Sequence, residues 1–332
     1  MDLHIAGVGA YLPPGRGVAD AVAAGEYDAE SAERDGLASA CVEPRLGPPA
    51  MAARAAEEAL EEAAGRYERL TASFYACIDF QGARYWQAAP YVAAATGHPD
   101  VPAFDVVQEC NGMLACLELA GRYVREPGDA VLISSGDRFD HPWVRRWYAD
   151  QSILGDGGAA VVVSGTPGAA RILSIATTSD YALEAEARGG TFIRGDDLSV
   201  VDFDQARRDF WASTVPMLEH YARLDAAVRS CVGEALDRAA TTASELAFAV
   251  PVVTTSWRTR IQLERYLGLG LERSTWDFGR TTGHVGTADQ VLGLHHLLRR
   301  GRVRAGDRVL LLGGGTGFTV TAAVLEISED PV

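Results

Sequence analysis

The feature that most constrains the fold of this 332-residue chain is an internal duplication. The segment Glu126-Pro-Gly-Asp-Ala-Val-Leu-Ile-Ser-Ser-Gly in the first half is matched by Arg304-Ala-Gly-Asp-Arg-Val-Leu-Leu-Leu-Gly-Gly in the second. Both segments predict a turn followed by a buried strand. Each is preceded by the same pattern of a strand, a helix and a second helix. The predicted strands are 72–79 and 246–253, and the predicted helices are 86–95, 115–124, 258–267 and 291–300.

The order of these elements predicts an α/β architecture. Alternating strands and helices favour largely parallel sheets covered by helices, and two such halves give a layered fold. A Gly-Thr-Pro-Gly turn near 165–170 separates an N-terminal half, residues 1–166, from a C-terminal half, residues 167–332. Residues 181–210 interrupt the second copy with little apolar periodicity. We expect an insertion there, over one face, where substrate loops often lie.

Composition indicates a large core in a cytoplasmic protein. Hydrophobic residues make up 48% of the chain, enough to bury the interior of one two-lobed unit or two domains. No apolar run is long enough for a membrane span, and the start Met1-Asp-Leu-His does not resemble a signal peptide. The five cysteines form no CxxC pair and no metal-ligand spacing. We therefore expect reduced thiols and no metal site.

Charge and glycine placement exclude several classes of function. A net charge of −15 argues against nucleic-acid binding, which requires a surplus of basic residues. All 30 basic residues are arginine, so mechanisms that depend on lysine are excluded. The glycine clusters 155–158 and 313–317 lead into predicted strands, whereas a dinucleotide-binding loop leads into a helix.

Cys110 is the candidate nucleophile. It lies where a predicted extended segment, 105–109, turns into a helix, and the positive end of a helix dipole favours the thiolate. The spacing alone is equally compatible with a buried structural thiol. The second copy carries His284 and Asp289 in the corresponding block, so the duplicated fold would bring the three side chains together. The alternatives are an ordinary hydrogen-bonded histidine and an aspartate that favours a helix start.

Several segments together resemble the ketoacyl-ACP synthase III enzymes of the thiolase superfamily. They are Ile5-Ala-Gly-Val-Gly-Ala-Tyr-Leu-Pro, the Cys110 block, Leu154-Gly-Asp-Gly-Gly-Ala-Ala and Gly313-Gly-Gly-Thr-Gly-Phe-Thr. The resemblance implies a five-layered αβαβα fold built from two duplicated halves, and a homodimer. It also implies that Cys110 takes an acyl group from acyl-CoA or an acyl carrier protein as a thioester. The phosphopantetheine-linked acyl donor is then a substrate, and no permanently bound cofactor is expected.

The chain departs from this family at the residues that support condensation. Condensing members resemble one another in a histidine and an asparagine that together hold a decarboxylating malonyl thioester. Here Thr254 lies at the position of that histidine, and His284 replaces the asparagine. Enolate charge needs converging hydrogen-bond donors, so the loss of one makes carbon–carbon condensation unfavourable.

The remaining set, Cys110, His284 and Asp289, resembles the Cys-His-Asp arrangement of synthase-III-like acyltransferases of antibiotic and polyketide biosynthesis. His284 would act as the base on an acceptor, and Asp289 would orient its ring. The resemblance also implies an oxyanion hole made by the backbone N–H groups of Cys110 and Thr316. The functional alternatives are a condensing enzyme and a non-catalytic thiolase-fold partner subunit.

Other positions carry weaker predictions. Arg258, Arg260 and Arg265 lie on one predicted helix, where relatives resemble one another in docking carrier proteins; CoA phosphates or plain solvent exposure would explain them equally well. Glu109 would oppose the Cys110 thiolate by like charge or contact the acceptor. The acyl group and the acceptor cannot be predicted, because loops such as 181–210 set the pocket shape.

Overall fold

The computed structural model describes residues 2–147, 152–188 and 202–329. Nine strands are hydrogen-bonded in one continuous series. The strands of the N-terminal half form one end of this series, and those of the C-terminal half form the other. No helix in these described ranges is both long and apolar enough to cross a membrane.

The two halves build matching sheets. The N-terminal sheet runs in the order β5 (Ala103–Val107), β4 (Arg69–Cys77), β6 (Asp129–Asp137), β7 (Gly157–Ser164) and β1 (Leu3–Tyr11). The C-terminal sheet follows as β8 (Ala170–Ser179), β11 (Thr319–Ile327), β10 (Arg308–Gly315) and β9 (Leu246–Val250). In both, a parallel pair (β4 with β6, β9 with β10) is followed by antiparallel neighbours. Only a short pairing of β1 with β8 joins the two sheets.

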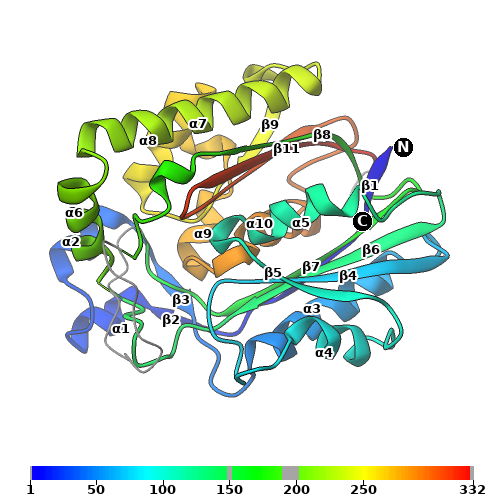
Figure 1. The fold of residues 1–332 in the computed structure, drawn as a ribbon, viewed down its shortest axis with the longest axis horizontal. Coiled ribbons are helices and arrows are strands. Elements are labelled where there is room, and N and C mark those ends of the chain that lie inside the picture. The colour runs from blue at the N-terminus through cyan, green and yellow to red at the C-terminus, as the bar shows by residue number, and fades with distance from the viewer. Residues whose placement is uncertain (1, 148–151, 189–201, 330–332) are drawn as a thin grey trace.

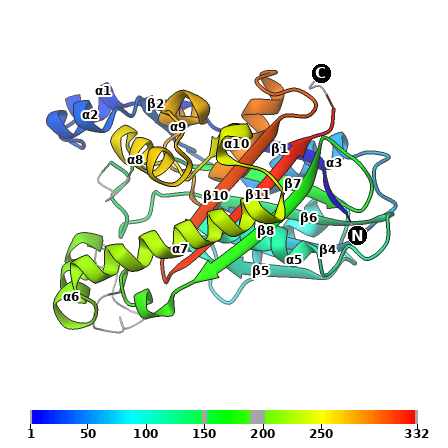
Figure 2. The same cartoon turned by 90° about the horizontal axis from the view of Figure 1, so that it is seen from above.

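Helices complete the layers, as Figure 1 shows. One outer layer holds α3 (Pro48–Glu62) and α4 (Ala88–Ala95), and the other holds α7 (Met217–Arg238) and α8 (Ser256–Leu267). Between the sheets lie α5 (Gly112–Ala120) and α10 (Asp289–Arg299). Figure 2 shows α7 lying across β8 and β11. The predicted five-layered αβαβα fold is therefore confirmed.

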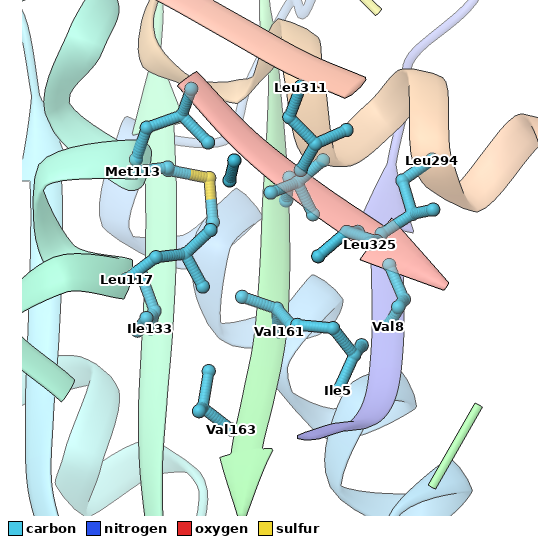
Figure 3. Packing of buried hydrophobic residues seen from close by; sticks show 14 of the residues in the cluster. Ile5, Val8, Met113, Leu117, Ile133, Val161, Val163, Leu294, Leu311 and Leu325 are labelled. Atoms are coloured by element: carbon cyan, nitrogen blue, oxygen red, sulfur yellow. The ribbon is translucent and has the colours of Figure 1, made fainter. Parts of the chain in front are cut away.

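The main hydrophobic core lies between the two sheets. Met113 and Leu117 of α5 and Leu294 of α10 pack there with strand residues of both sheets, among them Val161 of β7 and Leu325 of β11 (Figure 3). Because the central helices are covered on both faces, polar side chains at their N-terminal ends are withdrawn from bulk water. This is the region in which the candidate site lies.

The outer helix α3 packs unusually close to β1. A Cβ added to Gly7 would lie 2.2 Å from the Ala59 carbonyl oxygen, and one added to Gly9 would lie 2.0 Å from that of Ala55. The facing side of α3 is made largely of alanine, so helix and strand backbones approach each other directly. The glycines of the predicted opening motif thus serve packing of the outer layer.

Smaller elements surround the layers. These are β2 (Gly15–Gly17), α1 (Val18–Ala23), α2 (Ala29–Asp35), β3 (Ser39–Cys41), α6 (Phe203–Ser213), α9 (Trp276–Thr282) and the 3₁₀ turns η1 (Glu109–Asn111), η2 (Tyr181–Leu183), η3 (Ala243–Glu245), η4 (Leu271–Arg273) and η5 (Gly286–Ala288). Within the predicted insertion, η2 and most of α6 are regular, and residues 189–201 lie outside the described part. Phe210 of α6 packs against Leu183, so these two elements share a small core.

Candidate active site

Cys110 lies in η1, between the end of β5 and the start of α5. It is half-buried, whereas the other four cysteines are buried. Burial raises the pKa of Cys41 to about 12 and of Cys231 to about 11, and raises those of Cys77 and Cys116 further still. These four therefore remain protonated thiols under ordinary conditions.

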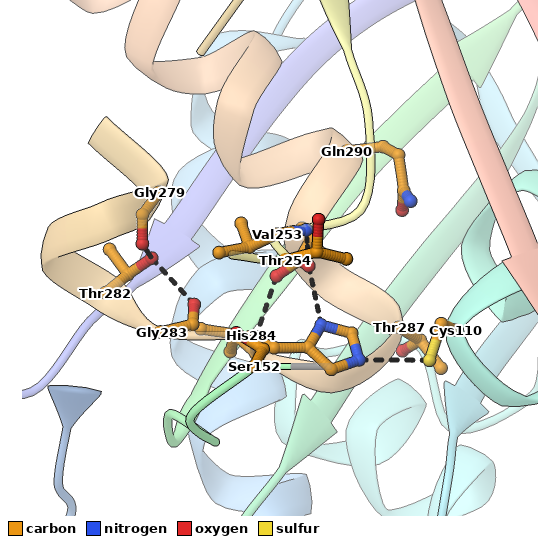
Figure 4. Close-up of polar contacts among 12 residues, drawn as sticks. Cys110, Ser152, Val253, Thr254, Gly279, Thr282, Gly283, His284, Thr287 and Gln290 are labelled. Carbon is orange, nitrogen blue, oxygen red and sulfur yellow. Dashed lines mark hydrogen bonds and ion pairs between the residues drawn. The ribbon is translucent and has the colours of Figure 1, made fainter. Parts of the chain in front are cut away.

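The structure brings the predicted cysteine and histidine together. The Sγ atom of Cys110 lies 3.0 Å from Nε2 of His284, although the residues are 174 positions apart (Figure 4). The backbone of His284 is held by the other half, because its N–H donates to the Ile153 carbonyl at 2.8 Å and its carbonyl accepts from Gly155 N–H at 2.8 Å. Gly283 precedes it with φ +71°, in the left-handed region that favours glycine.

Asp289 completes the chain of contacts. Its Oδ2 lies 2.6 Å from Nδ1 of His284 and also accepts the Val253 N–H at 2.7 Å. Its Oδ1 accepts the Val285 N–H at 2.8 Å. Two backbone donors therefore fix the carboxylate, and the carboxylate fixes the imidazole so that Nε2 faces the sulfur.

The electrostatics of the site favour a charged imidazole. Burial alone would lower the pKa of His284, but the negative charges of Cys110 and Asp289 outweigh it and raise that pKa well above its usual value. An imidazolium 3.0 Å from the sulfur stabilises a thiolate in turn. The arrangement therefore suits an imidazolium that faces the Cys110 sulfur.

Two further carboxyl groups lie close to this pair. Burial and the nearby charge of Asp79 raise the pKa of Glu109 to about 7, while His284 opposes the shift. Asp137, at the end of β6, is fully buried, and its pKa is also raised to about 7, chiefly by burial. The sequence analysis overlooked Asp137. The signal was available, because Ser134, Ser135 and Asp137 are polar residues within a strand predicted to be buried.

The Gly313–Gly317 loop lies against the turn that carries the cysteine. A Cβ on Gly315 would lie 2.3 Å from the Gln108 carbonyl oxygen, and one on Gly313 would lie 2.9 Å from Oδ1 of Asn111. Thr316 follows directly, with its side chain exposed. Its backbone N–H, together with that of Cys110, remains the predicted oxyanion hole.

Thr254, which the sequence places where condensing relatives carry a histidine, presents a hydroxyl group. Thr254 is buried, and its Oγ1 lies 2.9 Å from the Oγ1 of Thr259, a residue of α8. Four other histidines have partners of their own away from Cys110: His141 stacks on Trp143, His220 accepts from Trp211 Nε1–H, His295 contacts Glu58 and His296 stacks on Phe278.

The three predicted contact arginines lie on α8, in the outer helix layer. Arg265 is exposed and forms an ion pair with Asp225 at 2.5 Å. The Arg258 guanidinium lies over the Trp257 ring, 4.7 Å from its centroid. Arg260 is exposed on the same helix. The structure therefore places them apart from the central layer that holds Cys110.

Two models of 3-oxoacyl-[acyl-carrier-protein] synthase III match the chain, one over residues 104–181 and its C-terminal counterpart over residues 236–327. The β-ketoacyl-[acyl-carrier-protein] synthase III 3 of Streptomyces coelicolor is 31% identical over 74% of this chain and 72% of its own length.

Solved structures agree in fold. The acyltransferase ChlB3 superposes with a TM-score of 0.93 at 30% identity, covering 100% of this chain and 99% of its own. The priming β-ketosynthase of the R1128 polyketide pathway superposes with a TM-score of 0.77 at 22% identity, covering 99% and 97% of the two chains. The sequence matches and the shared fold lead to one conclusion: the chain belongs to the 3-oxoacyl-[acyl-carrier-protein] synthase III family, transferases of the thiolase superfamily.

Proposed function

We propose that this protein is an acyltransferase that carries its acyl group as a thioester on Cys110. The donor is an acyl-CoA or an acyl carrier protein, and the acceptor is a hydroxyl, an amine or a carrier thiol in secondary metabolism. The observation that carries the proposal is the continuous contact from Cys110 Sγ through the His284 ring to Asp289, with spacings of 3.0 and 2.6 Å. Transfer occurs without decarboxylative condensation.

In the first step the Cys110 thiolate attacks the carbonyl carbon of the donor thioester. A new carbon–sulfur bond forms, the donor's carbon–sulfur bond breaks, and the His284 imidazolium gives its proton to the departing thiolate, which leaves as a thiol. The backbone N–H groups of Cys110 and Thr316 would hold the oxyanion between these events. The products are an acyl-Cys110 thioester and a neutral imidazole.

The second step depends on the loss of the negative charge on Cys110 in the first step. The Cys110 charge is one cause of the raised pKa of His284, and a thioester no longer carries it. Acylation thus converts His284 from an acid into a base, which takes the proton of the acceptor. The acceptor attacks the thioester, Cys110 leaves as a thiolate, and the resting thiolate–imidazolium pair is restored.

The main alternative is a condensing synthase. That reaction places enolate charge on a thioester oxygen and needs donors that converge on it. Thr254 occupies the place where a second imidazole would stand, and its hydroxyl faces Thr259 at 2.9 Å. The similarity to a solved structure described as an acyltransferase, ChlB3, also favours transfer.

The proposal extends to partners and location. An acidic carrier protein would dock on α8 through Arg258 and Arg260, with Arg265 contributing less because Asp225 already neutralises it. Two copies would assemble as a homodimer through the exposed edge of β5. Five free cysteines suit a reducing compartment, which supports the cytoplasm.

Intact-protein mass spectrometry after mixing with acyl-CoA and acyl-carrier thioesters tests the function. We expect wild type to gain the acyl mass and Cys110→Ala to gain none. His284→Ala should load slowly and retain its acyl group when an acceptor is added, because the base is missing. Carbon dioxide release from a malonyl thioester would favour the condensing enzyme, and no adduct with any donor would favour the non-catalytic partner.

The same donor panel tests the docking surface. Arg260→Glu should slow loading from the acyl carrier protein by roughly 10-fold while leaving loading from acyl-CoA unchanged, since the exposed charge steers an acidic partner. Arg304→Glu, a charge reversal of an arginine whose side chain is 84% exposed in the loop before β10, serves as the control. Equal slowing by both variants would contradict docking on α8.

A further inference from the structure

Asp137 links the nucleophile-bearing half to the turn between His284 and Asp289. Its Oδ1 accepts the Ile78 N–H at 2.9 Å, and its Oδ2 accepts the Thr287 N–H at 3.2 Å. Gly286, with φ +58°, lies so close that a Cβ there would be 2.2 Å from Oδ2. The carboxylate therefore binds the end of the N-terminal sheet to the turn η5.

Thr287, within η5, makes a set of contacts with the N-terminal half. Its hydroxyl hydrogen-bonds with that of Ser135 on β6 and lies 3.4 Å from the Ala76 carbonyl oxygen on β4. A Cβ on Gly112, the first residue of α5, would lie 2.9 Å from the Thr287 Cγ2 atom. The turn is thus seated between β4, β6 and the start of the helix that follows Cys110.

The position of η5 decides the position of the base. The turn is bounded by His284 two residues before it and by Asp289 directly after it. A shift of η5 away from β6 would carry both residues away from Cys110. Misplacement of a catalytic group by about 1 Å can reduce a rate by roughly 100-fold.

We propose that Asp137 is a positioning residue that sets the pairing of Cys110 with His284 by holding η5 against the N-terminal half. The inference rests on the proposed function of that pair. It assigns Asp137 a role that is separate from contact with the substrate.

The charged groups around Asp137 also indicate that this carboxyl group has a functional role. Burial raises the pKa of Asp137 to about 7 and Glu109 adds to the shift, while the two backbone donors and the imidazolium of His284 oppose it. Cys77 and Tyr75 of β4 also face this carboxyl group. A carboxyl group buried beside Glu109, with two backbone N–H groups and the His284 imidazolium to favour its charged form, is costly to keep for packing alone.

Alkylation of Cys110 by iodoacetamide tests the inference without an acyl donor. Peptide-level mass spectrometry would measure the rate at which Cys110 is alkylated, as its sulfur displaces iodide from the reagent, at pH 6 and at pH 9. A free cysteine thiol has a pKa of about 8.5 and is mostly protonated at pH 6, so alkylation at that pH depends on help from a neighbouring imidazolium, whereas at pH 9 an unassisted thiol also reacts. Both Asp137 oxygens accept backbone N–H groups, and a carboxyl group keeps acceptor capacity when it is protonated at pH 6, whereas an asparagine amide has a single acceptor oxygen. We therefore expect Asp137→Asn to slow alkylation at pH 6 by roughly 10- to 100-fold and to change it little at pH 9.

Asp129→Asn is the matched control. Asp129 lies at the other end of β6, is equally buried, and also accepts two backbone N–H groups, from Arg125 and Glu126. The Asp129→Asn variant should have a lower melting temperature than wild type, and its Cys110 alkylation rates at pH 6 and pH 9 should equal those of wild type. Slowing by Asp129→Asn to the same degree, or an unchanged profile for Asp137→Asn, would overturn the proposal.

Two further variants keep the result decisive. In a His284→Ala background, Asp137→Asn should have no additional effect at pH 6, whereas a merely structural role would slow alkylation again. If Asp137→Asn does not fold, Thr287→Val removes the hydroxyl contacts of η5 and should shift the profile in the same direction by a smaller factor; no shift would overturn the inference. Because alkylation needs no thioester, failure of acyl loading leaves this test intact.

Discussion

Glu109 places an ionisable carboxyl group next to the nucleophile at a cost in backbone energy. Its φ of +50° lies in the left-handed region, which a residue with a Cβ adopts at a cost of roughly 1 kcal/mol. The neighbouring Gly315 makes room for it, since a Cβ there would lie 3.2 Å from the Glu109 Cβ. The conformation keeps the carboxyl group half-buried beside His284, where burial and Asp79 favour its neutral form.

This raised pKa predicts how stability depends on pH. The pKa of Glu109 is about 7 in the folded protein and about 4.3 in an unfolded chain, so the folded state holds more protons between these values. Stability contributed by this group therefore falls as the pH rises from about 4 to about 7. Glu109→Gln removes the effect, and its melting temperature should exceed that of wild type by more at pH 8 than at pH 5. An equal difference in melting temperature between Glu109→Gln and wild type at both pH values would contradict the raised pKa of Glu109.

The residues of the candidate site differ in how well they can be predicted from the sequence. Cys110, His284 and Asp289 could be predicted because the duplication aligns their blocks, and the structure places them within hydrogen-bonding distance. Asp137 could be noticed as a polar residue in a buried strand, but its partner could not be predicted, because that depends on which turn the other half places against β6. The exposure of Glu109 likewise depends on Gly315, some 200 residues away in the chain.

At the scale of elements, the contact of α3 with β1 depends on glycine. Gly9→Ala would place a methyl group 2.0 Å from the Ala55 carbonyl oxygen, so α3 must move outward. We expect a loss of about 1–3 kcal/mol, the usual range for overpacking. Gly233→Ala in α7 is the control: nothing lies within 4 Å of the added Cβ, and alanine favours the helix by about 0.5–1 kcal/mol. Urea unfolding of both variants checks the contrast, which fails if Gly9→Ala is as stable as wild type.

Element types were predictable where the periodicity was strong. The strands expected at 72–79 and 246–253 correspond to β4 and β9, and the helix expected at 258–267 corresponds to α8, which begins two residues earlier at Ser256. The helix expected at 86–95 begins at Ala88 instead, where the Ala88 and Ala89 N–H groups donate to Asp105. A carboxylate from the next strand fixes that end, and no local pattern records it.

At the scale of the whole molecule, the N-terminal sheet ends in an exposed apolar edge. Phe104 and Val107 of β5 are 42% and 61% exposed, and Tyr85, Trp86 and Tyr91 are exposed nearby. An unpaired strand of this kind is a template for pairing with another copy. The proposed homodimer would cover it and continue the sheet.

Light scattering after size-exclusion chromatography tests this arrangement. Wild type should have twice the chain mass of 35.4 kDa, and Val107→Lys should shift the population toward monomer because a charge would be buried at the interface. Leu218→Lys is the control, since Leu218 is 80% exposed on α7, away from β5. A dimer that survives Val107→Lys, or one that Leu218→Lys dissociates equally, would place the interface elsewhere.

The layered fold as a whole followed from the duplication, because two β/α units leave few ways to bury their apolar faces. The short pairing of β1 with β8, through which the two sheets meet, did not follow from it. Neither half contains a residue pattern that specifies the partner of its edge strand. The relation between the halves is set by side chains that only the assembled core brings into contact.

The separation of 174 residues between Cys110 and His284 has a consequence for the newly made chain. Translation produces Cys110 well before His284. Ser135 and Asp137 likewise contact Thr287 of η5, which is translated only later. A ribosome-bound chain that stops short of residue 284 therefore carries an unactivated thiol. Under the proposed function, acyl donors would meet an activated sulfur only after the C-terminal half has folded onto the first.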